Sequence, residues 1–442
     1  MLVFLHVLII FIKGLFFQIL KNKKKSKLYL STHQILNKFS YRITNNSHYD
    51  KLIFLREYKY ILSSLFKRKE SFFCYDIEGD AIILEGGNSF IEKEKAYVNY
   101  HHKDVVLHSY LSKDNIISLN FSNMFDKIII LFLLNIFSLP IFLITLFSVK
   151  RANISLAVRE LIEIILLIKY LLKNKINLIY DFIPYEKDSN FLSYCLGSFS
   201  VEILKIPSLG PLNTHNHFII ADKLITSSAY HKEEVFLLKD NFFVSSYEKW
   251  LPEHALDYLE IYPIKENIQI QSSIGFYSHA CWLRQEDGNL KSPLFSYNDE
   301  IELLNILAQY SLKIREKIIV FPHPKELLKA NKKKAKKFYR DIFSDNFEFF
   351  ESGKTAMNFH KIDIAVSTYS TVLFERLLMG YKSIFYTKSI NFPIDGSALK
   401  NICFNNKEDL INRIELFSNY SNKIFFEINS LENYVFNKEF IK

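Results

Sequence analysis

The chain has 442 residues, a formal net charge of +9 and an apolar fraction of 49%. This length exceeds what one hydrophobic core usually organises, so we expect two or three domains, and the apolar fraction excludes wholesale disorder. The four cysteines lie far apart without a CxxC pair, which favours a reducing compartment over a disulfide framework or a structural zinc site. The excess of basic over acidic residues favours an anionic lipid surface or an anionic substrate as the partner. No nucleic-acid-binding motif is visible, so nucleic acid is not an expected partner.

The first twenty residues are strongly apolar, and a run of lysines follows at once: Lys21, Lys23, Lys24, Lys25 and Lys27. A cleaved signal peptide has the opposite order, with its positive charge before the apolar run. We therefore expect residues 1–30 to form a membrane-surface helix with a polybasic flank that attracts anionic lipid. An ordinary core helix with a solvated lysine tail is the alternative.

A second apolar segment, residues 128–149, has 22 residues without a formal charge. A bilayer core takes roughly 20 helical residues to cross, so the segment is long enough to span a membrane. Lys150 and Arg151 follow it and would place the next part of the chain on the cytoplasmic side. Because Pro140 interrupts the segment, a kinked re-entrant hairpin and a buried helix are further interpretations.

From residue 155 onward, helical and extended patterns alternate. We expect helices at 157–172 and 192–200 and extended segments at 175–180, 201–206 and 218–226. A second alternation has strands at 268–276, 317–321, 362–366 and 383–386 and helices at 299–314 and 371–379. Such alternation predicts parallel, doubly wound sheets. We expect an α/β protein with two Rossmann-type domains facing a cleft, an N-terminal domain at 31–265 and a C-terminal domain at 266–442.

Ligands of open parallel sheets bind beyond the carboxyl ends of the strands, and a first polar cluster follows the strand at 317–321. It consists of His323, Pro324, Lys325 and Glu326. An imidazole at a strand end can donate a hydrogen bond to a phosphate or ribose oxygen, and the proline fixes the turn. A loop histidine without a ligand is the alternative.

A second cluster lies between the strand at 362–366 and the helix at 371–379. It contains Ser367, Thr368, Ser370 and Thr371. Hydroxyl groups and backbone N–H groups at a helix N-terminus form an anion site that the helix dipole strengthens. Plain N-capping by Ser370 or Thr371 is the alternative interpretation.

A third cluster follows the first strand of the C-terminal domain and contains Gly275, Tyr277, Ser278 and Arg284. A glycine lets the backbone approach a ligand, and an arginine can bind phosphate or carboxylate with two parallel hydrogen bonds. We predict that this loop takes part in nucleotide binding. Interdomain packing by the aromatic residues Phe276, Tyr277 and Trp282 is the alternative.

His323 with Pro324 and Ser370 with Thr371 resemble the HP motif and the Ser/Thr motif of bacterial capsule and lipooligosaccharide sialyltransferases, over about residues 268 to 390. The resemblance implies a GT-B fold and a CMP-activated sugar such as CMP-sialic acid. It also implies that His323 assists the leaving phosphate, which the two hydroxyls contact. The same pattern is similar to teichoic-acid glycerophosphotransferases, which use CDP-glycerol. The acidic motif of the sialyltransferases is out of place, because Glu286-Asp287-Gly288 lies in the C-terminal half.

The general base of a glycosyl transfer has to reach the acceptor hydroxyl from the N-terminal domain. Asp181, at the end of the expected strand 175–180, has a suitable position, and His215 and His217 compete with it. No DxD pair follows a strand, so we expect neither a metal nor another cofactor.

These features together predict an inverting glycosyltransferase at the cytoplasmic face of the bacterial inner membrane. It would transfer a nucleotide-activated sugar to a glycan or glycolipid of a surface polysaccharide. A CDP-polyol phosphotransferase and a non-catalytic, membrane-associated scaffold of polysaccharide export are the alternatives.

Overall fold

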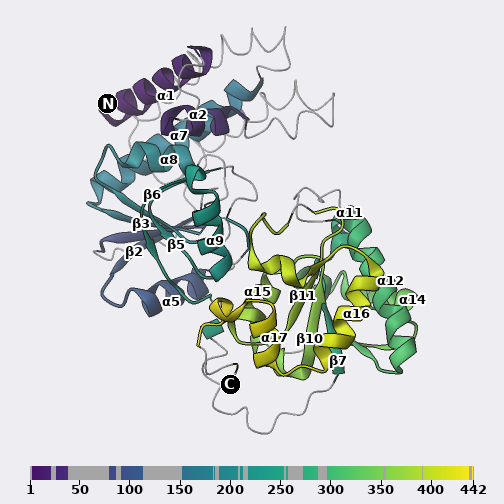
Figure 1. Cartoon of the computed structure of the whole chain (residues 1–442). Coiled ribbons are helices and arrows are strands. Elements are labelled where there is room, and N and C mark those ends of the chain that lie inside the picture. The colour runs from purple at the N-terminus through teal and green to yellow at the C-terminus, as the bar shows by residue number, and fades with distance from the viewer. Residues whose placement is uncertain are drawn as a thin grey trace. The chain divides into compact units, whose positions relative to one another are not determined.

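The computed structural model describes residues 2–20, 26–37, 79–85, 91–112, 152–182, 184, 189–207, 210–212, 218–252, 255–256, 272–286, 296–351, 355–390, 392–437 and 441. The chain forms two units (Figure 1). Unit 1 comprises Met1–Pro207, His215–Ile225 and Asp240–Glu248, and unit 2 comprises Ser208–Thr214, Thr226–Lys239 and Lys249–Lys442. Helix α9 (Ala229–Leu237), which the sequence placed in the N-terminal domain, therefore belongs to unit 2. The apolar segment 128–149 lies outside the described residues.

The sheet of unit 1 has the strand order β2-β1-β3-β4-β5-β6. Its strands are β1 (Ala81–Glu85), β2 (Leu107–Ser112), β3 (Leu178–Asp181), β4 (Glu202–Lys205), β5 (Ile219–Ile225) and β6 (Phe242–Glu248). Every neighbouring pair is parallel. The register places Asp181 beside Lys205, at the carboxyl ends of β3 and β4.

Of the described helices, four lie on one side of this sheet and α5 (Ile91–His101) lies on the other (Figure 1). The four are α1 (Leu2–Leu20), α2 (Lys27–Asn37), α7 (Ala152–Lys173) and α8 (Ser189–Leu196). The Leu and Ile side chains of α7 pack with those of β1, β3 and β4 in one buried cluster, because the two faces of a buried parallel sheet need apolar cover. Within the part of the chain that the structure describes, no helix is both long and apolar enough to cross a membrane.

The sheet of unit 2 has the order β12-β11-β10-β7-β8-β9. Its strands are β7 (Ser272–Tyr277), β8 (Ile318–Phe321), β9 (Phe347–Phe349), β10 (Ile362–Ser367), β11 (Ser383–Tyr386) and β12 (Cys403–Phe404). All neighbouring strands are again parallel. The expectation of two parallel-sheet α/β domains is therefore confirmed.

In unit 2, α12, α14 and α16 lie on one side of the sheet, while α15 and α17 lie on the other (Figure 1). Besides α9, the described α-helices of unit 2 are α11 (Cys281–Glu286), α12 (Tyr297–Ile314), α13 (Pro324–Leu327), α14 (Lys332–Phe343), α15 (Thr371–Leu378), α16 (Lys407–Ser418) and α17 (Asn422–Ile428). The short 3-10 helices are η4 (Lys239–Asn241), η6 (Ala356–Lys361), η7 (Ala398–Ile402) and η8 (Glu432–Tyr434). The layers are those of a doubly wound fold.

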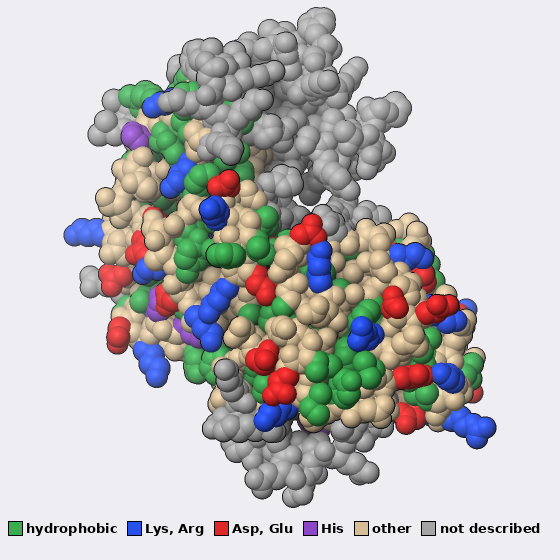
Figure 2. All heavy atoms as spheres, in the orientation of Figure 1, with side chains coloured by type: hydrophobic (Ala, Val, Ile, Leu, Met, Phe, Trp, Pro, Cys, Tyr) green, Lys and Arg blue, Asp and Glu red, His purple; other side chains and the backbone are tan. Residues whose placement is uncertain are grey.

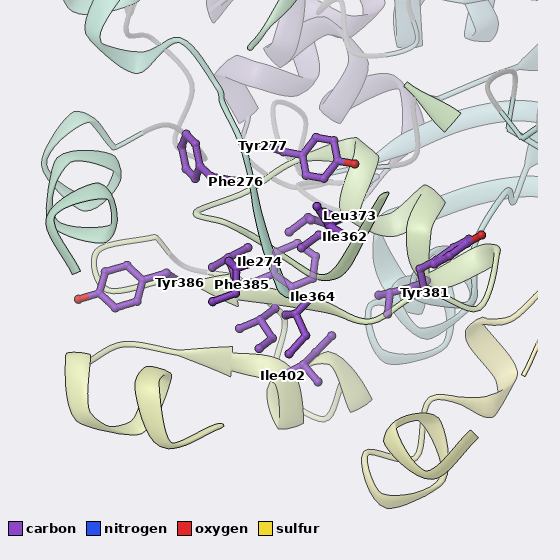
Figure 3. Close-up of a cluster of buried hydrophobic side chains, with 14 of the residues drawn as sticks. Ile274, Phe276, Tyr277, Ile362, Ile364, Leu373, Tyr381, Phe385, Tyr386 and Ile402 are labelled. Carbon is purple, nitrogen blue, oxygen red and sulfur yellow. The ribbon is translucent and has the colours of Figure 1, made fainter. Parts of the chain in front are cut away.

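Branched aliphatic and aromatic side chains from the central strands fill the core of unit 2. Ile274, Ile364 and Phe385 are almost completely buried and lie among the side chains drawn in Figure 3. Two buried cations make contacts at the end of the sheet where strands β10 and β11 begin. The Arg376 guanidinium donates to the carbonyl oxygen of Phe359 (2.7 Å), and the Lys382 ammonium pairs with the Asp363 carboxylate (2.8 Å). These contacts lie at the end of the sheet opposite to the predicted clusters.

Candidate functional site

The sheet of unit 2 reverses its winding between β7 and β10. From β7 the chain adds β8 and β9 on one side, and it later adds β10, β11 and β12 on the other. In doubly wound sheets, the crevice at such a switch point, beyond the carboxyl ends of the two strands, is where ligands bind. All three sequence-predicted clusters of unit 2 follow strands at or next to this point, since they come after β7, β8 and β10.

Two aromatic rings lie next to each other at the switch point. The ring of His279, just after β7, stacks on that of Tyr369, just after β10, with centroids 5.5 Å apart and an angle of 23° between the planes. The Ser367 hydroxyl donates to the carbonyl oxygen of Tyr277 (2.7 Å) and ties the two strand ends together. These contacts hold the two loops in one geometry.

A segment that is distant in the sequence, at Gly210, also contacts the loop after β10. A Cβ atom at this position would lie 1.8 Å from the Tyr369 hydroxyl oxygen, so only a glycine fits there. The Gly210 carbonyl oxygen lies 2.8 Å from Nε2 of His231 on α9. Gly210 was not among the predicted site residues, because no local pattern links residue 210 to a strand end that comes about 160 residues later.

Arg284 and His323 bring two polar groups to the same rim. Arg284, on α11, donates from Nε to the carbonyl oxygen of His279 (2.9 Å). Its Nη2 lies 3.4 Å from Nε2 of His323, which follows β8. Arg284 thus joins the loop after β7 to the loop after β8. A guanidinium and an imidazole side by side form a suitable pair for an oxyanion with several oxygen atoms.

The hydrogen bond from the Lys325 backbone assigns the tautomer of the neutral His323 ring. Its Nδ1 accepts from the backbone N–H of Lys325 (3.1 Å), as part of the cap that begins α13. In a neutral ring the proton is therefore on Nε2, where it is available for a ligand. Burial, with Arg284 and Lys325 nearby, lowers the pKa of His323 to about 4. The imidazole is thus a neutral N–H donor near pH 7, and an anion bound to it would raise its pKa.

The cluster that follows β10 leads into α15. Ser370 occupies the N-cap position, where its hydroxyl oxygen accepts from the N–H of Val372 (3.3 Å). The Thr368 hydroxyl is 1% exposed and has no hydrogen-bond partner among the described residues. Thr371, the first residue of α15, is half-buried. The predicted helix N-terminus is therefore present. Ser370 caps it in the ordinary way, and the buried Thr368 hydroxyl beside it has no partner among the described residues.

Two buried glutamates hold the loops that carry these groups. The first, Glu300 on α12, accepts from the backbone N–H groups of His279 (3.1 Å) and Cys281 (2.9 Å) with its two carboxylate oxygens. Burial and the nearby Glu326 raise the pKa of Glu300 to about 7. Glu300 therefore fixes the backbone that leads from His279 to Arg284. Glu300 could not be recognised from the sequence, because it lies in the first turn of an ordinary amphipathic helix.

The second glutamate, Glu326, was predicted to bind the nucleotide. It is fully buried, and its carboxylate accepts from the N–H of His323 (2.7 Å) and from the indole N–H of Trp282 (2.5 Å). The Tyr339 hydroxyl lies 2.9 Å from the same carboxylate and 2.8 Å from the Ser278 hydroxyl oxygen. Burial raises the pKa of Glu326. The structure thus gives Glu326 and Ser278 supporting positions beneath the loops rather than positions on the rim.

The structure places Gly275 and Tyr277 within the core of unit 2. Gly275 lies inside β7, and a Cβ atom there would lie 2.3 Å from Cδ1 of Ile362 and 3.0 Å from Cε2 of Phe321. Tyr277 is buried, its ring stacks on Phe321 at 4.5 Å, and the guanidinium of Arg376 lies over it. Both residues belong to the core next to the site, and Figure 3 labels Tyr277 among its buried side chains. Of the predicted set, Arg284, His323, Pro324 and Thr371 have partly or fully exposed side chains.

The structure places Asp181, the predicted base, in a buried position. Asp181 is the last residue of β3 and is 1% exposed. Its carboxylate accepts from the Ser189 hydroxyl (2.6 Å) at the start of α8, and its register neighbour Lys205 is fully buried and donates to Asn190 (2.9 Å). The role of Asp181 as the base stays a prediction. The competing His215 and His217 lie outside the described residues.

Comparison with known proteins gives a likeness of structure only. No protein-family model and no curated protein matches the sequence. Similar solved structures include UDP-GlcNAc 2-epimerase from Neisseria meningitidis bound to UDP-GlcNAc, with 12% identity, a TM-score of 0.43, and coverage of 81% of this chain and 95% of that one. A glycosyltransferase from Rickettsia africae has 13% identity, a TM-score of 0.39 and coverage of 81% and 87%. MurG from Acinetobacter baumannii has 9% identity, a TM-score of 0.37, and coverage of 81% of this chain and 94% of that one. These scores are too low to transfer a function to this chain.

Proposed function

We propose that the chain is a GT-B-type glycosyltransferase and that unit 2 binds the phosphate of its nucleotide-activated sugar. The supporting observation is the pair formed by Arg284 and His323 next to the switch point of the sheet, 3.4 Å apart. The guanidinium supplies a permanent positive charge, and Nε2 of His323 supplies a neutral N–H. The N-terminus of α15 lies at the end of the neighbouring central strand and adds a helix dipole of the right sign.

In the proposed reaction an acceptor hydroxyl oxygen forms a bond to the anomeric carbon of the sugar, with inversion. The bond between that carbon and the phosphate oxygen breaks, and the nucleotide leaves with the electron pair. Arg284 and His323 stabilise the negative charge that develops on the leaving phosphate, the type of contribution that preorganised donors make in enzymes. No described residue is assigned to the base that takes the hydroxyl proton. Independence from metal ions is part of the proposal.

For the donor we propose a CMP-sugar such as CMP-sialic acid, and for the acceptor a glycan or glycolipid of a bacterial surface polysaccharide. The resemblance of His323-Pro324 and Ser370-Thr371 to sialyltransferase motifs supports this choice. CDP-glycerol is the alternative donor, because the teichoic-acid enzymes share the same pattern. UDP-GlcNAc is tested beside them as a donor with a different base.

A nucleotide panel tests the proposal. Purified protein is titrated with CMP, CDP, UDP and GDP, and binding is followed by calorimetry and by the thermal unfolding midpoint. We expect CMP to bind most tightly and to stabilise the fold through linkage. Incubation with CMP-sialic acid, CDP-glycerol or UDP-GlcNAc and measurement of the released nucleotide then identifies the donor. Absence of binding to all four nucleotides would contradict the proposal and favour the scaffold.

The substitution His323→Asn separates the ligand role of this residue from its capping role. An asparagine oxygen can still accept the N–H of Lys325, but the Nε2–H donor is lost. A hydrogen bond to a charged group contributes roughly 1.5–3 kcal/mol, so we expect the nucleotide Kd to rise by about 10- to 100-fold with little change in stability. His360→Asn, at the end of η6 just before β10, is the matched control at the opposite edge of the sheet. Equal Kd values for the wild type and His323→Asn would show that the site is elsewhere.

A further inference from the structure

One face of α1 is packed against the rest of unit 1. Val7, Ile10 and Phe11 are buried, and they belong to the same cluster as the core side chains of α7 and α8. Gly14 lies so close to α2 that a Cβ atom there would fall 2.1 Å from Oγ1 of Thr32. One side of the helix is therefore packed on the domain. The next question is what its other side contacts.

The other side of α1 carries large apolar side chains in contact with solvent. Leu5, Ile9 and Ile12 are 50%, 54% and 40% exposed. They are spaced by four and three residues, so they lie on one face of the helix. Lys13, four residues after Ile9, is exposed beside them. In Figure 2 hydrophobic and basic side chains lie at the surface over α1. Single exposed apolar residues are ordinary, but a row of them on one helix face marks an interaction site.

The net charge of the chain is concentrated in the N-terminal stretch of the sequence that contains this helix. Residues 1–49 contain eight Lys and Arg and no Asp or Glu, because the first acidic residue is Asp50. The remaining 393 residues then carry 48 Lys and Arg against 47 Asp and Glu, so almost the whole net charge of +9 lies in this N-terminal stretch. On the face shown in Figure 2, the basic and acidic side chains of the other described residues are intermixed.

We propose that α1 lies in the plane of an anionic lipid bilayer surface, with Leu5, Ile9 and Ile12 inserted at the boundary between headgroups and acyl chains. An apolar helix face combined with basic residues is the recognised arrangement of an interfacial helix, and each basic residue near anionic headgroups adds to the attraction. Because the opposite face of α1 is packed on protein, the helix lies on the membrane and does not cross it. The inference is independent of the proposed enzyme activity.

Vesicle sedimentation with the full chain tests this proposal. The vesicles consist of phosphatidylcholine alone or of an equal mixture of phosphatidylcholine and phosphatidylglycerol. We expect binding to the anionic vesicles, weakened at high salt. The triple variant Leu5→Gln, Ile9→Gln, Ile12→Gln should bind at least tenfold more weakly. Lys13→Gln should lower the partition constant about fivefold, the equivalent of one basic residue.

A matched control substitutes exposed apolar residues elsewhere. Leu312, Ile424 and Ile428 are 65%, 43% and 50% exposed on α12 and α17 of unit 2, and their replacement by Gln should leave vesicle binding unchanged. Circular dichroism and the thermal midpoint establish that both triple variants are folded. Equal binding of the α1 variant and the wild type would overturn the proposal. So would the finding that the α1 variant only converts a dimer into a monomer, because the face would then bind a second copy of the chain.

Discussion

Glu300 and Glu326 are buried carboxylates whose hydrogen-bond donors in the structure are uncharged. Backbone N–H groups, the Trp282 indole and the Tyr339 hydroxyl surround them. Burying a carboxylate without a cation is costly, and such costs are concentrated at functional sites. Here the two carboxylates fix the backbone of His279 and His323, so the cost is explained by the precision with which the site loops are held.

The raised pKa of Glu300 makes the stability of the fold depend on pH. Its folded pKa is about 7 and its ordinary value is 4.5, so the folded state binds the proton more tightly. This stabilising contribution is complete below pH 4.5 and is lost as pH rises through about 7, by on the order of 3 kcal/mol. Glu300→Gln removes the contribution. In urea unfolding, the variant should be less stable than the wild type at pH 5 and should equal or exceed it at pH 8.

The low pKa values of His279 and His323 act in the opposite direction, because their folded values of about 3 and 4 lie below 6.5. Stability from these two groups is present above pH 6.5 and is lost as pH falls toward 4. They are the same in both proteins, so the difference between the wild type and Glu300→Gln isolates the glutamate. A difference that stays constant from pH 5 to pH 8 would show that Glu300 does not titrate in this range.

The substitution Gly275→Ala distinguishes a packing role of Gly275 from a role in ligand binding. In Gly275→Ala the new Cβ would overlap Cδ1 of Ile362, and overpacking of this kind costs about 1–3 kcal/mol. We expect the free energy of unfolding in urea to fall by about this amount and the nucleotide Kd to stay the same. Ile362→Val removes the overlapping Cδ1, so the double variant should be more stable than the two single effects predict. A weaker Kd in folded Gly275→Ala would restore the ligand role.

At the scale of elements, short buried runs were easy to predict and their neighbours in space were not. The strands Ile318–Phe321 and Ser383–Tyr386 and the helix Thr371–Leu378 lie almost where their apolar patterns indicate. These patterns also place His323 and Ser370 at strand ends. Glu300 could not be found, because its role comes from contacts about twenty residues away. The same holds for Tyr339, which contacts Ser278 across 61 positions.

The N-caps of α15 and α17 can be compared, because a ligand is proposed to bind at the first and none at the second. Ser370 caps α15, and Ser421 caps α17 with a similar hydrogen bond (3.3 Å to the N–H of Ile424). Each substitution to Ala should cost about 1 kcal/mol of stability, measured by urea unfolding. Only Ser370→Ala should also weaken CMP binding. If both variants bind CMP as the wild type does, the cluster after β10 is a cap and nothing more.

At the scale of the whole molecule, the alternation of elements predicts two α/β units, and the structure confirms them. The boundary near residue 265 is less simple, because 208–214 and 226–239 belong to unit 2. A sequence pattern shows where an element begins and ends but not which sheet it joins, since α9 has the same local signals in either unit. Its place follows from tertiary contacts, such as the hydrogen bond from the Leu212 N–H to the Glu234 carboxylate (2.7 Å).

The location of both tryptophans allows a test of where the nucleotide binds. Trp250 and Trp282 belong to unit 2 and are buried, so tryptophan fluorescence follows the unfolding of this unit. A nucleotide at 100 times its Kd stabilises the unit that binds it by about 2.7 kcal/mol. We expect this to move the urea midpoint of the fluorescence transition up by about 1 M. Hydrogen exchange should show the added protection in the loops after β7, β8 and β10 and none in β3 to β5. Added protection in β3 to β5 instead would place the nucleotide in unit 1 and contradict the assignment of Arg284 and His323.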